Sequence, residues 1–172
     1  MRAVIPSTYD ADIERAAALF LPQWDWRWLK AQLYAESELK PDAVSAAGAK
    51  GIAQIMPGTW EDAAAALHFP ATATPFEARY AIRAAAWYMS VLRSKWKSLP
   101  RSEDDRRRLA QASYNAGLGN LIKAQKRAQG ALDYPRIIAR LSEVTGHANA
   151  HETTTYVERI ARVYTELAHA GA

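Results

Sequence analysis

Apolar residues recur at intervals of three or four along most of the chain, which is the spacing of amphipathic helices. Three segments place a Ser or Thr three residues before an acidic residue, as a helix-capping box requires: Thr59–Asp62, Thr74–Glu77 and Ser102–Asp105. The pattern predicts helices at roughly 9–20, 25–38, 59–68, 75–97, 103–116, 119–129, 135–143 and 152–169. We therefore expect a mainly α-helical protein.

The segment 40–57 does not fit that periodicity. It contains Gly48 and Gly51 and leads into the apolar run GIAQIM, which predicts a loop with at most a short β-hairpin. No internal repeat, low-complexity tract or linker divides the 172 residues, and this length suits one domain. A single domain over residues 1–172 is the expectation.

The composition narrows the classes of protein to consider. Cysteine is absent, which excludes disulfides and thiol catalysis, and a hydrophobic content of 49% is enough for a sizeable core. Asp10, Asp12 and Glu14 stand where an export signal needs an uninterrupted apolar stretch. No window reaches the roughly 18 apolar residues of a membrane span. We expect a soluble chain with no signal peptide and no membrane span.

The charge indicates an anionic partner. The net charge is +4, but its sign alone does not choose between nucleic acid, a lipid surface and an acidic polymer. The densest basic stretch, RSEDDRRR at 101–108, is interrupted by acidic residues. We interpret it as the solvated start of a helix, because charge runs are usually exposed faces.

One acidic residue lies on an apolar helical stripe. Leu29, Leu33 and Glu36 share a face of the helix predicted at 25–38. Partial burial raises the pKa of a carboxyl group, so that it can hold a proton near neutral pH and give it to a leaving group. Glu36 is therefore a candidate general acid, although an ordinary Glu at the rim of a core has the same spacing.

Other chemistries find less support. HETTTY, at 151–156, lacks the second His of a zinc-protease helix, and GAKG lacks the spacing of a phosphate loop. We expect no metal and no cofactor. Trp24, Trp26 and Trp28 could stack on sugars or bases, but packing in the core and its rim is the more general role of aromatic residues.

Three strings, taken in order, resemble the signatures of one enzyme family. They are ESELKPDAVSAAGAKGIAQIMPGTW at 36–60, ASYNAGLGN at 112–120 and ETTTYVERI at 152–160. Together they resemble the soluble lytic transglycosylases of glycoside hydrolase family 23, whose catalytic domain is similar to goose-type lysozyme. The resemblance implies a lysozyme-like helical fold and cleavage of the β-1,4 bond between N-acetylmuramic acid and N-acetylglucosamine in peptidoglycan.

The resemblance also implies a role for each matched residue. Glu36 takes the position of the family's single catalytic acid. The residues that would bind substrate are Ser45, Gly51, Gln54, Met56, Tyr114, Asn115, Glu152 and Tyr156. Gly117 is placed to end the helix that carries Tyr114 and Asn115. For Glu152 another reading stays open, because an acid in the first turn of a helix is favourable for the helix dipole alone.

The mechanism implied by the resemblance needs one carboxyl group. Glu36 would protonate the glycosidic oxygen and then accept the proton of the sugar's 6-hydroxyl, giving a 1,6-anhydro product with help from the substrate's acetamido group. The sequence departs from the family pattern at Leu39, where an aromatic residue is common, and at Ala53, where methionine is common. Both changes could alter the shape of the substrate pocket, but they leave the catalytic acid in place.

Several alternatives stay open. A hydrolytic muramidase on the same fold would use a second carboxylate, for which Glu38, Asp42 and Glu61 are candidates. A non-catalytic glycan-binding or assembly protein and a nucleic-acid binder are further ones. A chain without an export signal fits a phage endolysin made in the host cytoplasm, or a virion-borne enzyme. We expect a monomer that acts on peptidoglycan strands and not on nucleic acid.

Overall fold

The fold was taken from a computed structural model, which describes residues 4–171. The elements in chain order are α1 (Asp10–Phe20), α2 (Arg27–Ser37), α3 (Pro57–Ala66), α4 (Ala78–Lys95), α5 (Glu103–Ala116), α6 (Leu118–Arg127), α7 (Tyr134–Ile138), α8 (Ser142–Thr145) and α9 (His147–Ala170). Among the described residues no β-strand forms. The prediction of a mainly helical protein is confirmed.

The chain separates into two compact units. One contains the residues up to Tyr88 and those from Ile160 on, and the other is Met89–Arg159. Both boundaries fall inside a helix, α4 in one case and α9 in the other. The expectation of a single domain over residues 1–172 stays a prediction.

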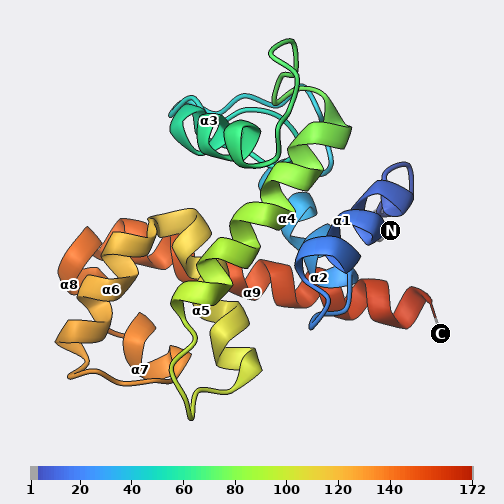
Figure 1. The fold of residues 1–172 in the computed structure, drawn as a ribbon. Helices are drawn as coiled ribbons and strands as arrows, with labels where there is room; N and C mark the ends of the chain where they lie inside the picture. Colours follow the sequence, from blue (N-terminus) through green and yellow to red (C-terminus); the bar gives the residue numbers. More distant parts are fainter. Residues whose placement is uncertain (1–3, 172) are drawn as a thin grey trace. The chain divides into compact units, whose positions relative to one another are not determined.

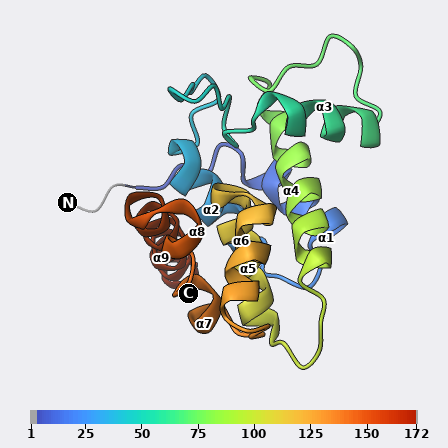
Figure 2. The same ribbon diagram turned by 90° about the vertical axis from the view of Figure 1, so that its left-hand side faces the viewer.

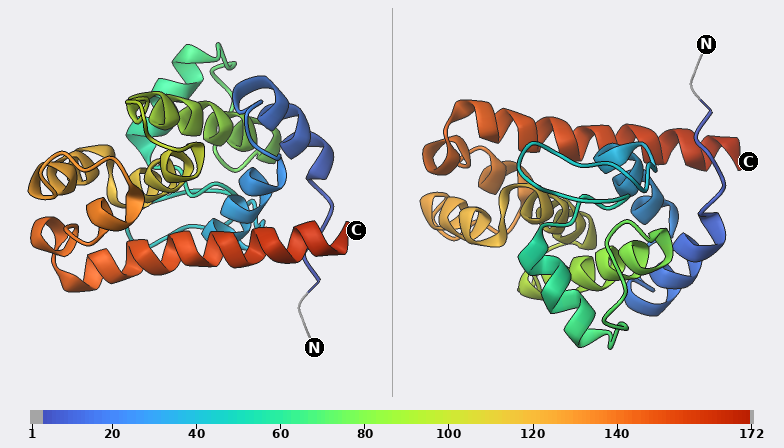
Figure 3. Two further views of the ribbon diagram at one scale, coloured as in Figure 1. Left: turned by 90° about the horizontal axis from the view of Figure 1, so that it is seen from below. Right: turned by 90° about the horizontal axis from the view of Figure 1, so that it is seen from above.

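The first unit is built around α2. Helix α1 packs against it, and the Lys30 ammonium, which is 3% exposed, lies 2.6 Å from the Asp10 carboxylate. On another side the Trp28 ring stacks on Tyr164 from the end of α9, with ring centres 3.7 Å apart, and Figure 3 shows this stretch of α9 running beside α2. The packing role expected for Trp28 is therefore confirmed.

The second unit is organised by α6, which contacts α5, α7 and α8 (Figures 1 and 2). Its core includes Leu109 of α5, Leu121 of α6 and Ile137 of α7, all fully buried. Helix α4 is tied to α5 by Arg93, whose Nε donates to Glu103 Oε1 at 2.6 Å. The solvated start expected for 101–108 holds only in part, because Arg101 is 8% exposed and its Nε donates to the Leu132 carbonyl oxygen.

One predicted helix, 103–116, coincides with the observed one, five differ from the observed ones by one to three residues at an end, and the last two differ more. Helix α3 begins at Pro57, before the predicted cap Thr59, because Pro57 occupies the first helical turn, where a missing N–H costs nothing. Helix α4 begins at Ala78 instead of residue 75. The predicted helix at 135–143 is two short helices, α7 and α8. Helix α9 begins at His147, directly after Gly146 ends α8 with φ +84°.

The loop prediction for 40–57 is confirmed. Two isolated antiparallel bridges join Val44 to Lys50 and Lys50 to Ile55, so the segment folds back on itself twice without forming a strand. In the part of the chain that the structure describes, no helix is both long and apolar enough to cross a membrane.

Candidate active site

Glu36 is half-buried and lies one residue before the end of α2. Its helix is anchored there by Ser37, whose hydroxyl donates to the Ile52 carbonyl oxygen at 2.7 Å. Glu38 and Leu39 then adopt positive φ angles of +56° and +62° and turn the chain into the loop. Leu39, where the sequence departs from the family pattern, is 5% exposed, so the change affects the packing of the core. The end of α2 and the loop are thus locked together around Glu36.

Gly51 is required by the shape of the loop. Its φ is +78°, and a Cβ placed there would lie 1.9 Å from the Pro75 carbonyl oxygen. Its own N–H donates to the Ala43 carbonyl oxygen at 2.8 Å. Nearby, the Ser45 hydroxyl accepts the Ala49 N–H at 3.0 Å, which closes the first turn of the loop. Ser45 and Gly51 therefore shape the backbone of the segment that follows the acid.

Gln54 has its amide nitrogen occupied within the loop. Nε2 donates to the carbonyl oxygens of Gly51, at 2.9 Å, and Ala43, at 3.2 Å, and the residue has φ +49°. These two bonds orient the side chain, so that the carbonyl oxygen is the end available to an N–H donor from outside the loop. Met56 follows as the N-cap residue of α3 and is 46% exposed.

The second signature ends α5 as expected. Tyr114 and Asn115 lie on its last turn and are half-buried, and Gly117 follows with φ +91°, its N–H donating to the Ser113 carbonyl oxygen. Asn115 Oδ1 accepts the Thr153 hydroxyl at 2.7 Å. This bond joins α5 to α9 and brings the second and third signatures together.

A polar cavity of about 170 Å³ lies at that junction within the second unit. Its lining residues are Asn115, Ala116, Asn120, Thr145, Asn149, Glu152 and Thr153. Glu152 is exposed and lies in the second turn of α9, because the helix begins five residues earlier than predicted. The hypothesis that Glu152 only stabilises the first turn of its helix is thus wrong. The structure instead places Glu152 in the lining of a polar cavity. Tyr156 is 8% exposed and belongs to the buried side of α9.

The structure therefore assembles the predicted residues in two groups. Glu36, Ser45, Gly51, Gln54 and Met56 come from one continuous segment of the first unit. Tyr114 and Asn115 of α5 and Glu152 and Tyr156 of α9 belong to the second unit, where Asn115 and Glu152 line one cavity. The sequence analysis missed five cavity residues: Ala116, Asn120, Thr145, Asn149 and Thr153. The four-residue interval between Asn149 and Thr153, which puts both on one helix face, was the available signal.

The candidates for a second carboxylate give no paired arrangement. Glu38 is exposed and lies 3.2 Å from the Lys40 ammonium. Asp42 and Glu61 are also exposed.

Comparison with known proteins identifies relatives of the whole arrangement. The family model described as the transglycosylase SLT domain matches residues 17–137. The chain is 32% identical over 157 residues to membrane-bound lytic murein transglycosylase F of Desulfosudis oleivorans, covering 82% of this chain and 32% of the relative. Its counterpart in Marinobacter nauticus is 29% identical over 158 residues, which cover 83% and 30% of the two chains. The chain thus spans about a third of the length of these relatives.

Solved structures share the fold. The 70 kDa soluble lytic transglycosylase of Escherichia coli superimposes with a TM-score of 0.72 at 21% identity, covering 93% of this chain and 24% of that one. An inactive mutant of the lytic transglycosylase Slt of Pseudomonas aeruginosa gives 0.75 at 25% identity, with coverage of 96% and 25%. The lysozyme-like helical fold expected from the sequence is confirmed.

Proposed function

Because the chain belongs to the transglycosylase SLT domain family, we propose that it is a lytic transglycosylase that cleaves peptidoglycan without consuming water. One observation carries the proposal: the family match over residues 17–137 contains both Glu36 and the Tyr114–Asn115 pair. The relatives named above are lytic murein transglycosylases, which supports the same substrate class. Their greater length leaves the activity of this chain a proposal.

In the proposed reaction Glu36 acts first as an acid and then as a base. The protonated carboxyl group gives its proton to the glycosidic oxygen while the bond from that oxygen to C1 of the muramic acid breaks. The acetamido carbonyl oxygen of the same sugar stabilises the positive charge at C1. Glu36, now ionised, accepts the proton of the 6-hydroxyl as that oxygen bonds to C1. The products are a 1,6-anhydro sugar and a free 4-hydroxyl end, and the proton balance closes.

The chain's own contacts suit this scheme. Glu36 is half-buried at the end of α2, directly before the loop of the first signature, so it is partly shielded from bulk water. The orientation of Gln54 leaves its carbonyl oxygen for an N–H donor, such as that of an acetamido group. We assign binding roles to Ser45, Gly51 and Met56 in the loop through the backbone they shape. Tyr114, Asn115, Glu152 and Tyr156 are assigned to positioning the glycan by their place in the family signatures.

The test is the Glu36→Gln variant on purified cell walls. Loss of a general acid typically lowers a rate by about 10²–10⁴, so we expect release of soluble fragments to fall by at least about 100-fold. Glu14→Gln is the control, since it removes an exposed carboxylate of α1 in the same unit that has no role in either mechanism. Unchanged cleavage by Glu36→Gln would exclude the mechanism, and would equally exclude Glu36 as the acid of a muramidase.

Mass spectrometry of the wild-type digest distinguishes a lytic transglycosylase from a hydrolytic muramidase. An anhydro end is lighter than a reducing end by one water, so a hydrolytic muramidase would give the heavier product. A glycan-binding or assembly protein would bind walls and release nothing. A nucleic-acid binder would show salt-dependent DNA affinity that wall fragments do not reduce.

The proposed place of action is the bacterial cell wall. The named relatives are bacterial proteins, and the phage setting of the sequence analysis stays a prediction, as does the monomeric state. Residues 1–3, at the start of the segment in which no export signal was expected, lie outside the described residues. A net charge of +4 suits a substrate that carries carboxylates.

A further inference from the structure

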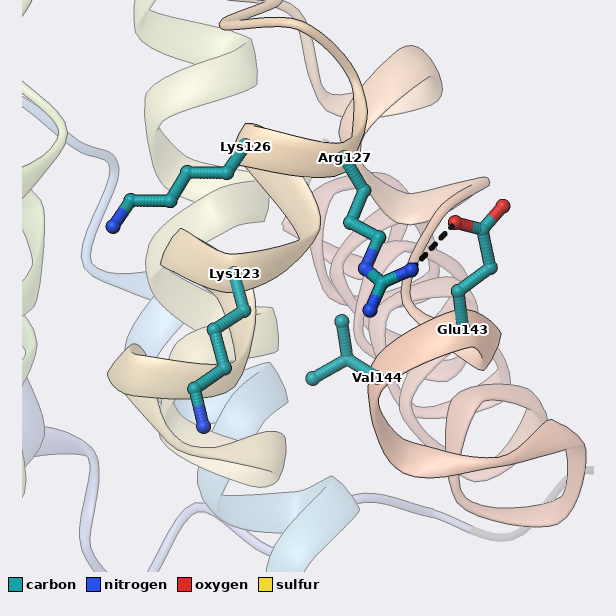
Figure 4. Close-up of a pocket in the computed structure, with 5 residues that line it drawn as sticks. All are labelled: Lys123, Lys126, Arg127, Glu143 and Val144. Carbon is teal, nitrogen blue, oxygen red and sulfur yellow. Dashed lines mark ion pairs between the residues drawn. The ribbon is translucent and has the colours of Figure 1, made fainter.

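A cationic groove lies between α6 and α8 in the second unit (Figure 4). It encloses about 580 Å³ and is lined by Lys123, Lys126, Arg127, Glu143 and Val144. In Figure 4 the three cationic side chains extend from α6, while Glu143 and Val144 come from α8. The groove therefore combines positive charge with one acidic and one apolar side chain.

Two of the charges in the groove have no protein partner. Lys123 and Lys126 are exposed, and within residues 4–171 neither ammonium forms an ion pair. Arg127 lies 3.9 Å from Glu143, which pairs more closely with Arg140 at 2.7 Å. The single carboxylate is thus shared, and the excess positive charge is free to attract an anionic ligand.

The groove and the polar cavity are lined by residues of the same two helices, α6 and α8. Asn120, Lys123 and Arg127 are spaced by three and four residues, so they share one face of α6. Asn120 lines the cavity that contains Asn115 and Glu152, and Lys123 and Arg127 line the groove. On α8, Thr145 lines the former and Val144 the latter. Both pockets therefore belong to the second unit and draw residues from neighbouring positions of α6 and α8.

We propose that this groove, defined by Lys123, Lys126, Arg127, Glu143 and Val144, binds the peptide stem of peptidoglycan. This inference rests on the proposed function, since the stem is joined to the muramic acid of the same substrate. A stem that contains D-Glu, diaminopimelate and D-Ala has several carboxylates, an ammonium group and methyl groups. The ammonium groups of Lys123 and Lys126 suit the carboxylates, Glu143 suits the ammonium and Val144 suits a methyl group. A phosphodiester polymer would instead meet repulsion from Glu143 and gain nothing from Val144.

Binding is tested on the full chain with Glu36→Gln, so that no substrate is turned over. The probe is the free tetrapeptide L-Ala-γ-D-Glu-meso-diaminopimelate-D-Ala, titrated by calorimetry at low salt. Each exposed ion pair lost weakens binding by about 1.5- to 5-fold, so Lys123→Gln with Lys126→Gln is expected to raise Kd by roughly 2- to 25-fold. Lys95→Gln with Lys97→Gln removes the same charge from exposed positions of the second unit and should leave Kd unchanged.

Two outcomes of the titration would contradict the proposal that the groove binds the peptide stem. Equal Kd values for the two double variants would show that only net charge matters. Tighter, groove-dependent binding of polyphosphate than of the tetrapeptide would assign the groove to a phosphodiester polymer. Esterifying the carboxylates of the tetrapeptide should raise its Kd by at least about 2-fold, and an unchanged Kd would also overturn the proposal.

Turnover separates a failure of this inference from a failure of the proposed function. The active chain is compared on intact glycan strands and on strands freed of peptide by an amidase. We expect the ratio of kcat/KM values, peptide-bearing over peptide-free, to fall by about 2- to 25-fold in the Lys123/Lys126 double variant and not in the Lys95/Lys97 one. If the double variant cleaves both substrates with an unchanged ratio, the peptide-binding role of the groove is wrong while the proposed function stands. If the wild type releases no anhydro products from either kind of strand, the proposed function itself is wrong.

Discussion

At the scale of single residues, two glycines of the same loop differ in what surrounds them. Gly48 and Gly51 have φ angles of +89° and +78°, which L-amino acids rarely adopt. Around Gly48 no atom would lie within 4 Å of an added Cβ, whereas at Gly51 the Pro75 carbonyl oxygen would lie at 1.9 Å. Gly48 therefore meets a conformational demand, and Gly51 meets that demand together with a steric one.

This difference gives a matched pair of variants. Gly48→Ala should lower the free energy of unfolding by about 1–2 kcal/mol, the cost of left-handed backbone for a residue with a Cβ. Gly51→Ala should cost roughly 3 kcal/mol or more, because the loop or Pro75 must also move. Urea denaturation followed by circular dichroism measures both. Equal decreases in the free energy of unfolding would mean that the loop around Gly51 accommodates the added Cβ without strain.

The amide side chains of Gln54 and Asn115 show a second residue-scale feature. Each is held at one end by the protein: Gln54 through its nitrogen and Asn115 through its oxygen. A side chain fixed in this way loses less rotamer freedom when it binds a ligand. The opposite end of each amide thus has a defined direction before a substrate arrives.

At the scale of elements, the same capping pattern gives different results in different helices. Ser102 is the N-cap residue of α5: its hydroxyl accepts the Asp105 N–H at 3.0 Å and donates to Asp105 Oδ2 at 2.7 Å. Thr59 has the same spacing from an acid but lies inside α3, which Pro57 starts. At Thr74 only half of the pattern forms, with Glu77 accepting the Thr74 N–H at 2.8 Å before α4 begins. The pattern marks a helix start only where no stronger signal precedes it.

The two cap candidates can be compared directly. Ser102→Ala should lower the free energy of unfolding by about 1 kcal/mol, because the Asp105 N–H loses its acceptor. Thr59→Ala removes a hydroxyl from a position that does not cap its helix and should change stability by less than about 0.5 kcal/mol. Thermal unfolding of the two variants beside the wild type provides the measurement. A larger loss at Thr59 would place the start of α3 there after all.

At the scale of the whole molecule, each unit carries an aspartate that favours its ionised form. The Arg27 guanidinium donates to the Asp25 carboxylate, with Nη2 at 2.6 Å from Oδ2, and lowers the pKa of Asp25 below 3.8. The Arg136 backbone N–H, followed by its side chain, lowers the pKa of Asp133 in the same way. A lowered pKa in the folded state means that folding favours the ionised group. The resulting stability is present above the unfolded pKa of 3.8 and is lost as the pH falls through the folded value.

Acid stability tests this linkage. We expect the Tm to fall once the pH drops below about 3.8, with Asp25→Asn showing a shallower fall than the wild type. The difference at neutral pH should stay below about 1 kcal/mol, because the pair with Arg27 is partly exposed and screened by solvent. Asp42→Asn is the control, since Asp42 is exposed and forms no ion pair within residues 4–171. If the Tm of Asp25→Asn and of the wild type fell identically with pH below about 3.8, the contribution of Asp25 to acid stability would be contradicted.

The sequence by itself determined the helical class, the loop at 40–57, the end of α5 at Gly117 and the position of Glu36 near the end of its helix. These features depend on neighbours within a few residues, where periodicity, glycine and capping act. The start of α3 was misjudged because Pro57 begins the helix before the capping pattern at Thr59, and α9 begins directly after Gly146, five residues before its predicted start.

Only the tertiary structure decided which distant groups meet. The contact of Gly51 with Pro75, the bond between Asn115 and Thr153 across 38 positions and the groove between α6 and α8 leave no periodic trace in the chain. Each depends on how two elements pack, and packing is set by the summed burial of many side chains rather than by any short pattern.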